Sequence, residues 1–295
     1  MSFFVTTTMT KSIYFFYFLV ALDIIFVSLS WSPANLDMAT YVNLSVPSQV
    51  DNTKRLLRSA KILGNLNAVS NFYICHDSID HPAKLEILFK LERTNISLNF
   101  VAVDRSRHQG FDSWIQLMCI SLVAHYKFMN KVTNNYVLYL DSHYVITRSL
   151  EFLIQPGSSK FHCLQGDLKI NGNAQSQLSL CNSSLLILHT SIGSSVHNLL
   201  QTIMYQNSLS IDFNTIFDEK YSMLLSLISS RLSNGITIIP TSGFVMRAHQ
   251  HWYNIPETPD LPALIEFDGD NHQLYFQDCL LNVFVKVRIL GLINI

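Results

Sequence analysis

The chain of 295 residues predicts an α/β fold, in which helices flank a mixed, mostly parallel sheet. Strand-like and helix-like stretches alternate along it, which is the pattern of a layered α/β domain. Residues 137–140, VLYL, form an apolar run typical of a strand that is covered on both faces. With 48% hydrophobic and 14% charged residues the chain can form one large domain or two small ones. We predict one domain over residues 40–295.

Residues 13–31 form an apolar segment that is interrupted by Asp23 and a few hydroxyl side chains. At 1.5 Å per residue the segment is long enough to cross a bilayer about 30 Å thick. Lys11 precedes it and the next basic residue is Lys54, which predicts a signal anchor with residues 1–12 in the cytosol and the remainder in the lumen. The shorter run 13–22 would suit a cleaved signal peptide, and a buried helix is a third interpretation. Residues 32–39 are predicted to be a linker.

The later elements are predicted from periodicity and flanking residues. The helix over 51–63 has Asp51 as its N-cap and an apolar face formed by Leu56, Leu57, Ala60 and Leu63. Further helices are predicted over 82–92, 111–130, 149–153, 194–205 and 219–231. Strands are predicted over 40–46, 71–75, 98–103, 136–140, 160–163, 184–189 and 236–239. Residues 249–260 are rich in aromatic, histidine and proline residues, which predicts a surface loop or lid.

Charge and cysteine usage limit the possible partners and compartment. The formal net charge is −1 and basic residues form no run, so we expect no nucleic-acid partner. Triplets that begin at Asn43, Asn95 and Asn182 fit the N-glycosylation pattern. The five cysteines lack zinc-ligand spacing, and we expect buried thiols, with one or two disulfides possible in an oxidising lumen and at least one cysteine unpaired. They are Cys75, Cys119, Cys163, Cys181 and Cys279.

The polar triplet Asp141-Ser142-His143 follows the apolar strand 136–140 directly. In α/β sheets ligands gather at the carboxyl ends of central strands. Because side chains alternate along an extended backbone, Asp141 and His143 should point the same way, and a carboxylate and an imidazole can share one ion. An aspartate at a strand exit is also typical of a turn or a helix N-cap, so the triplet alone leaves both interpretations open.

The order of elements and four motifs resemble the GT-A nucleotide-sugar transferases, especially retaining family 8 enzymes and the related nucleotide-diphospho-sugar transferase domain. The resemblance covers about residues 40–274. VLYLDSHYVITRSLEFL, residues 137–153, is similar to the family's LYLDxDxxVxxxLxxL, with His143 replacing the second aspartate. CNSSLLILHTS, residues 181–191, resembles an Asn-x-Gly strand, with Ser184 at the glycine. FDEKYSMLLSLI, residues 217–228, resembles an Asp-Gln helix start. EFDGDNHQL, residues 266–274, resembles the closing His-Phe-x-Gly-x-x-Lys-Pro-Trp.

The resemblance implies a Rossmann-like GT-A fold and a role in sugar transfer, with a retaining and metal-dependent mechanism. A UDP-sugar would be the donor, and a hydroxyl of a glycan, glycoprotein or glycolipid the acceptor, in the endoplasmic reticulum or Golgi lumen, or outside the cell if residues 1–31 are cleaved. The implied catalytic residues are Asn182, Asp218 and Glu219. Residues implied to bind the nucleotide sugar and its cofactor are Asp141, His143, Ser184, Gly269 and His272. Those implied to hold Mn²⁺ or another divalent cation are Asp141, His143 and Glu266.

The exchanged residues leave a second hypothesis open, a catalytically degenerate module of the same fold, tethered to the membrane, that binds a glycan or a partner protein. The usual ligands are two aspartates and a histidine, whereas this chain would offer Asp141, His143 and Glu266 with the residue types exchanged between positions. One ion with bonds of about 2.0 to 2.6 Å cannot engage all three if their carboxylate and imidazole atoms lie more than about 6 Å apart.

Overall fold

The computed structural model describes residues 36–266 apart from short internal segments. These segments are 65–68, 78–84, 86–88, 90–96, 105–111, 133–134, 147–149, 151–152, 155–159, 166–180, 208–216, 233–234, 241–244 and 248–262. The predicted helices over 82–92 and 149–153 and the predicted lid over 249–260 lie mostly or wholly outside the described residues, as does the apolar segment 13–31. Within the part of the chain that the structure describes, none of the helices has both the length and the apolar character needed to span a bilayer.

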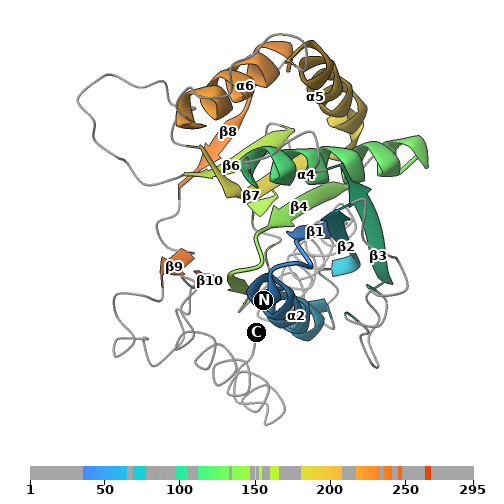
Figure 1. Ribbon diagram of the computed structural model, residues 1–295, viewed down its shortest axis with the longest axis vertical. Helices are drawn as coiled ribbons and strands as arrows, with labels where there is room; N and C mark the ends of the chain where they lie inside the picture. Colours follow the sequence, from blue (N-terminus) through green and yellow to red (C-terminus); the bar gives the residue numbers. More distant parts are fainter. Residues whose placement is uncertain are drawn as a thin grey trace, which may run out of the picture. The chain divides into compact units, whose positions relative to one another are not determined.

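The main sheet has seven strands in the order β3-β2-β1-β4-β7-β6-β8 (Figure 1). All of them run in the same direction except β7, which pairs antiparallel with both β4 and β6. The strands are β1 (Leu36–Val42), β2 (Val69–Asp77), β3 (Ser97–Val103), β4 (Tyr136–Leu140), β6 (Phe161–Gln165), β7 (Cys181–His189) and β8 (Thr237–Ile239). The predicted mixed, mostly parallel sheet is therefore confirmed.

Helices cover both faces of this sheet. On one face α2 (Pro47–Gly64) contacts β1 and β2, and on the other α4 (Asp112–Met129) contacts β1, β3, β4 and β7 (Figure 1). The core beneath α4 also includes side chains from α5 (Gly193–Asn207) and α6 (Phe217–Arg231). Alternation along β1 explains the two faces, because Ala39 and Tyr41 belong to the α4 core, whereas Met38 before them and Val42 after them are buried on the opposite side.

A second sheet of three short strands was not predicted. It consists of β5 (Tyr144–Ile146), β9 (Val245–Arg247) and β10 (Leu264–Glu266), in the order β5-β10-β9. β10 pairs antiparallel with β5, so that Glu266 lies opposite Tyr144. Because β5 follows β4 after a turn of three residues, this pairing brings the 266 end of the chain to the carboxyl end of β4.

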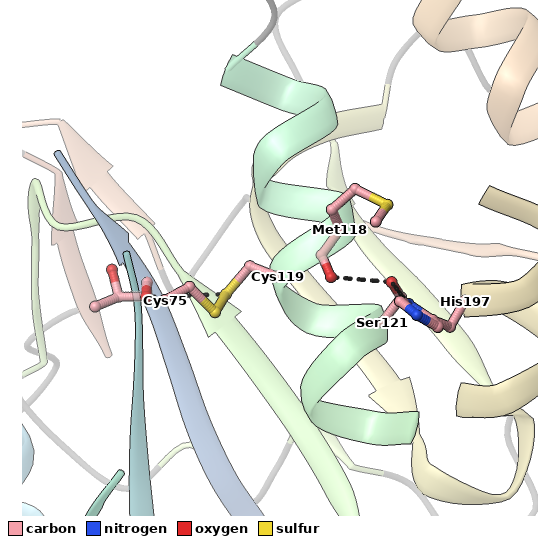
Figure 2. The surroundings of a disulfide bond; sticks show 6 residues. Cys75, Met118, Cys119, Ser121 and His197 are labelled. Carbon is pink, nitrogen blue, oxygen red and sulfur yellow. Dashed lines mark hydrogen bonds between the residues drawn. A yellow bond between two sulfur atoms is a disulfide. The ribbon is translucent and has the colours of Figure 1, made fainter. Parts of the chain in front are cut away.

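Two disulfides stabilise the main sheet. Cys75 of β2 is bonded to Cys119 of α4, which ties the helix to the sheet, with the two Cα atoms 5.8 Å apart (Figure 2). Cys163 and Cys181 join β6 to β7, with a Cα separation of 5.7 Å. The possibility of two disulfides is therefore confirmed for four of the five cysteines, and Cys279 lies outside the described residues.

The first strand begins earlier than predicted. β1 starts at Leu36, so residues 36–39, assigned to the linker, belong to the sheet, and the strand ends at Val42 rather than at residue 46. The start of this strand is hard to recognise from sequence, because it contains Asp37 and a carboxylate is unusual in a buried strand. Here Asp37 is 1% exposed, forms an ion pair with Lys127 at the end of α4, and accepts a hydrogen bond of 2.7 Å from Asn71.

Candidate functional site

The candidate site lies between β1 and β4, the point in the main sheet at which the order of the strands reverses. β2 follows β1 on one side and β4 lies on its other side, and in open α/β sheets such a switch point forms a crevice at the carboxyl ends of the strands. A small pocket occupies this position. Its lining combines the end of β1, the first turns of α2 and α4, and the end of β4, and comprises Tyr41, Gln49, Gln116, Tyr139 and Asp141.

Asp141 is held firmly at the end of β4. Its backbone N–H donates to Ser184 O of β7 at 2.9 Å, and its carbonyl accepts from Tyr144 N at 3.2 Å, which closes a tight turn. The carboxylate is bonded at both oxygens. Oδ1 accepts from the Ser142 N–H at 2.6 Å, and Oδ2 accepts from Gln116 Nε2 at 2.7 Å. The turn and these two bonds fix the direction in which the carboxylate points.

His143 lies between two carboxylates, one at each ring nitrogen. Nδ1 is 3.2 Å from Oδ1 of Asp141, and Nε2 is 3.3 Å from Oε1 of Glu266. The side chains are only partly accessible, at 26% for His143, 24% for Asp141 and 15% for Glu266. The sequence-based expectation that these residues lie together therefore agrees with the geometry, although they are contributed by different sheets.

The two carboxylates shift the acid–base behaviour of the imidazole. Burial alone would lower the pKa of His143, but the charges of Asp141 and Glu266 and their hydrogen bonds outweigh it and raise the pKa to about 10. Burial would likewise raise the pKa of Asp141, but the positive charge of His143 and the hydrogen bonds from His143 and Ser142 lower it below its usual value. Each group thus favours the charged form of the other.

A divalent cation could bind at Asp141 and His143 by replacing the proton on Nδ1, but the geometry does not place all three predicted ligands around one ion. Two cis ligands of one ion, with bonds of about 2.1 to 2.3 Å, lie about 3.1 Å apart, which matches the 3.2 Å between Asp141 Oδ1 and His143 Nδ1. Glu266 faces Nε2, whose lone pair points away from that position. In agreement, no group of three His, Cys, Asp or Glu side chains among the described residues is arranged around one ion.

The remaining predicted site residues divide into three groups. Ser184 is buried in β7, where its hydroxyl is 2.9 Å from the Tyr144 hydroxyl, and Asn182 of the same strand accepts a bond from Ser184 N at 2.9 Å. Asp218 and Glu219 lie in the first turn of α6, inside the helix rather than before it, and the positions of their side chains are not described. Gly269 and His272 lie outside the described residues.

Gln116 is a site residue that the motif comparison missed. It lies in the first half of α4, is 8% exposed, bonds Asp141 and lines the pocket. Its Oε1 is buried and has no hydrogen-bond partner among the described residues. A polar side chain inside the apolar helix segment SWIQLMCISLV was the available signal, because a buried amide usually requires partners.

No family model matches the sequence, and a search of curated proteins gives no match. The galactosyltransferase LgtC, solved with donor and acceptor sugar analogues, gives a TM-score of 0.53 at 12% identity over 85% of this chain and 95% of LgtC. The bifunctional glycosyltransferase WbbM gives 0.52 at 12% identity over 81% of this chain and 46% of WbbM.

The apo glycosyltransferase GlyE of Streptococcus pneumoniae TIGR4 gives a TM-score of 0.50 at 13% identity, over 86% of this chain and 63% of GlyE. The chain therefore spans nearly all of LgtC, but less than two thirds of GlyE and less than half of WbbM. At these identities the likeness concerns the fold. The predicted fold is confirmed, since this chain shares the GT-A architecture of solved glycosyltransferases.

Proposed function

We propose that the protein is a glycosyltransferase that moves a sugar from a nucleotide-diphosphate donor, a UDP-sugar, to a hydroxyl acceptor. The observation that carries the proposal is the pocket at the β1/β4 switch point, which contains Asp141 beside His143. The fold of solved glycosyltransferases and the resemblance of residues 137–153 to the family motif support it. The acceptor would be a glycan, a glycoprotein or a glycolipid.

The described side chains can be given roles in donor binding. The pocket lined by Tyr41, Gln49 and Gln116 would receive part of the nucleotide of the donor. Asp141 and His143 would hold a divalent cation such as Mn²⁺. When bound, this ion would neutralise the negative charge that develops on the leaving diphosphate.

The donor sugar would lie toward β7 and α6. Asn182 of β7 is near the site, because Ser184, two residues further along, receives the Asp141 N–H on its carbonyl. We propose that Asn182, Asp218 and Glu219 orient the sugar by hydrogen bonds, and that Gly269 and His272 approach the diphosphate. Retention of the anomeric configuration is part of the proposal and rests on the family resemblance alone.

We also propose a compartment in the secretory pathway, the lumen of the endoplasmic reticulum or Golgi, reached through a signal anchor or a cleaved signal at residues 13–31. The disulfides Cys75–Cys119 and Cys163–Cys181 support an oxidising environment. Asn43 and Asn182 differ as glycosylation candidates, because Asn43 follows the end of β1 whereas Asn182 lies within β7 beside the site. We therefore expect Asn43 rather than Asn182 to carry a glycan.

The test is donor turnover by the full chain. A panel of UDP-sugars, with GDP- and CMP-sugars as comparison, would be incubated with protein and Mn²⁺, and release of the free nucleotide would be measured. We expect release from a UDP-sugar, and its loss in Asp141→Asn. His125→Gln, in the contact between α4 and α5, is the matched control and should retain activity. UDP binding without turnover of any donor would favour the degenerate module instead.

A further inference from the structure

Glu266 is the predicted metal ligand whose placement differs from the expectation. It faces Nε2 of His143 at 3.3 Å, whereas Asp141 faces Nδ1 at 3.2 Å. The two nitrogens of an imidazole direct their lone pairs away from each other, so one ion bound at Nδ1 cannot also be reached from a carboxylate beyond Nε2. Glu266 and Asp141 therefore have different partners on the same ring.

A histidine that binds a metal commonly donates its other ring N–H to a carboxylate, which fixes the tautomer and the direction of the ring. Glu266 is placed to accept this bond. The backbone that carries this carboxylate is held by the strand pairing, because Glu266 lies opposite Tyr144, the residue that follows His143. Tyr144 is fully buried, and its hydroxyl lies 2.9 Å from that of Ser184 in β7. Asp141 also bonds Ser184, so the residues on both sides of His143 are attached to the main sheet.

The number of ligands points in the same direction. Asp141 and His143 supply two ligands at this position. Small divalent ions in phosphate-transfer sites are commonly bound by one or two protein groups, with phosphate oxygens and waters completing an octahedron. A site of this kind binds its ion weakly until the phosphate ligand is present.

We propose that Glu266 is a positioning residue, which accepts a hydrogen bond from the Nε2–H of His143 and orients the ring. Nδ1 then releases its proton to solvent and, together with Asp141, receives an ion that enters with the diphosphate of the nucleotide. This inference rests on the proposed function and deepens it. It differs from the ligand set implied by the resemblance, because the carboxylate at position 266 bonds the histidine and does not bind the ion. The protein alone should bind Mn²⁺ poorly, and Mn²⁺ and UDP should each increase the affinity for the other.

The test is a titration of the full chain with Mn²⁺, in which electron paramagnetic resonance measures the free ion, with and without UDP. Wild-type protein should bind Mn²⁺ at least tenfold more tightly when UDP is present. Glu266→Ala should weaken Mn²⁺ binding in the presence of UDP by about 10- to 100-fold. Glu266→Gln keeps an oxygen that can accept the Nε2 proton, so it should retain most of the affinity. A nitrogen coupling to bound Mn²⁺ should be present in wild type and absent in His143→Ala.

Three outcomes would overturn the inference. Equal losses in Glu266→Gln and Glu266→Ala would show that the carboxylate itself is a ligand. Tight Mn²⁺ binding without UDP would show that the protein supplies a complete site. Absence of nitrogen coupling in the wild type would exclude His143 as a ligand. Near-ultraviolet circular dichroism would confirm folding of each variant, and the isosteric Glu266→Gln carries the test if Glu266→Ala is unfolded.

UDP binding would be measured in parallel by calorimetry, which distinguishes a failure of this inference from a failure of the proposed function. If UDP binds with Mn²⁺ but the Glu266 variants behave in the wrong order, the inference fails while the proposed function stands. If UDP does not bind under any condition, both fail together.

Discussion

Asp37 shows how a single buried charge can hide a strand from sequence analysis. The carboxylate interrupts the apolar pattern of the segment LDMATYV, part of which falls in the predicted linker 32–39. The compensating charge, Lys127, lies ninety residues later and is also buried, at the end of α4. No local pattern can reveal such a partner, because the pair forms only after β1 and α4 have packed together.

Removing one member of this pair should destabilise the protein strongly. Lys127→Met leaves the buried carboxylate of Asp37 without its cation, which should lower the free energy of unfolding by about 3 to 5 kcal/mol. The double variant Asp37→Asn/Lys127→Met should recover a large part of this loss. Lys54→Met is the control, because Lys54 is 46% exposed and 3.9 Å from Asp51, and such a surface pair contributes about 0 to 1 kcal/mol.

Urea unfolding measures these differences. A Lys127→Met variant as stable as wild type would show that the buried pair does not contribute to stability, and a double variant less stable than both single variants would contradict the charge argument.

His143 and Glu266 show what the motif comparison could and could not predict. The exchange of a carboxylate and an imidazole between positions 143 and 266 predicted that these residues lie together, and their 3.3 Å contact agrees. The motif could not indicate which ring nitrogen faces which carboxylate. That detail depends on the pairing of β5 with β10, and strands of three residues carry no readable periodicity.

Gln116 provides a further test at the site. Gln116→Leu removes the 2.7 Å bond to Asp141 Oδ2 and the polar amide group from the lining of the pocket. We expect UDP affinity in the presence of Mn²⁺ to fall about tenfold, equivalent to about 1.4 kcal/mol. Gln201→Leu, at an exposed position of α5, should leave the affinity unchanged in the same calorimetric titration. Equal effects of the two substitutions would contradict the role given to Gln116.

At the scale of elements, long apolar patterns were predicted most accurately. α4 was predicted over 111–130 and is found at Asp112–Met129, since half of its 18 residues form or pack against the core on one face of the sheet. α2 begins at Pro47 rather than at Asp51, in keeping with the preference of proline for the first helical turn. The small sheet could not be predicted, because its three strands lie at 144–146, 245–247 and 264–266 and pair only in three dimensions.

The contact between α4 and α5 depends on the absence of a side chain at Gly193. A Cβ atom there would lie 2.5 Å from the backbone carbon of Ala124 and 2.7 Å from the backbone nitrogen of His125. Because neither helix backbone can move without disturbing its neighbours, Gly193→Ala should lower the free energy of unfolding by about 1 to 3 kcal/mol. Ser195→Ala, at an exposed position of the same helix, should change it by less than about 0.5 kcal/mol. A neutral Gly193→Ala in urea unfolding would contradict the close approach.

The same helix contact should weaken in acid. His125 and His197 stack with ring centroids 5.0 Å apart, and Ser121 lies 3.4 Å from His197 (Figure 2). Burial and the nearby His125 lower the pKa of His197, so the unfolded state binds the proton more tightly than the folded state. The contribution of neutral His197 is therefore present above the unfolded pKa of about 6.5 and is lost as pH falls below it.

Unfolding free energies between pH 7.5 and pH 5 test this sign. Wild type should lose more stability over this interval than His197→Gln, which cannot be protonated. An equal or smaller loss in the wild type would contradict the stated cause of the pKa shift.

At the scale of the whole molecule, the two disulfides predict a specific thiol count. Four of the five cysteines are paired, so protein denatured without reductant should react with one equivalent of a thiol reagent. The Cys75–Cys119 bond closes 44 residues, and by chain entropy the variant Cys75→Ala/Cys119→Ala should lose up to about 4 kcal/mol. Three or five free thiols in protein secreted from eukaryotic cells would contradict the oxidising compartment.

The architecture was more accessible from sequence than the site. Alternating strand and helix patterns predicted the mixed sheet, and the strand-end triplet at 141–143 marked the edge at which ligands would bind. The crevice itself depends on the strand order β2-β1-β4, which brings Tyr41 and Gln49 near Asp141 from segments far apart in the sequence. Short-range patterns do not contain that order, so the lining of the pocket could not be predicted.

The most direct test of the account is calorimetric titration of UDP into the full chain with Mn²⁺, repeated with excess chelator and with Asp141→Asn. We expect UDP to bind with Mn²⁺, to lose most of its affinity with chelator, and to show a similar loss in Asp141→Asn. UDP binding that is unchanged by the chelator and by Asp141→Asn, or no binding by folded wild-type protein, would contradict the claim that the end of β4 binds a nucleotide diphosphate.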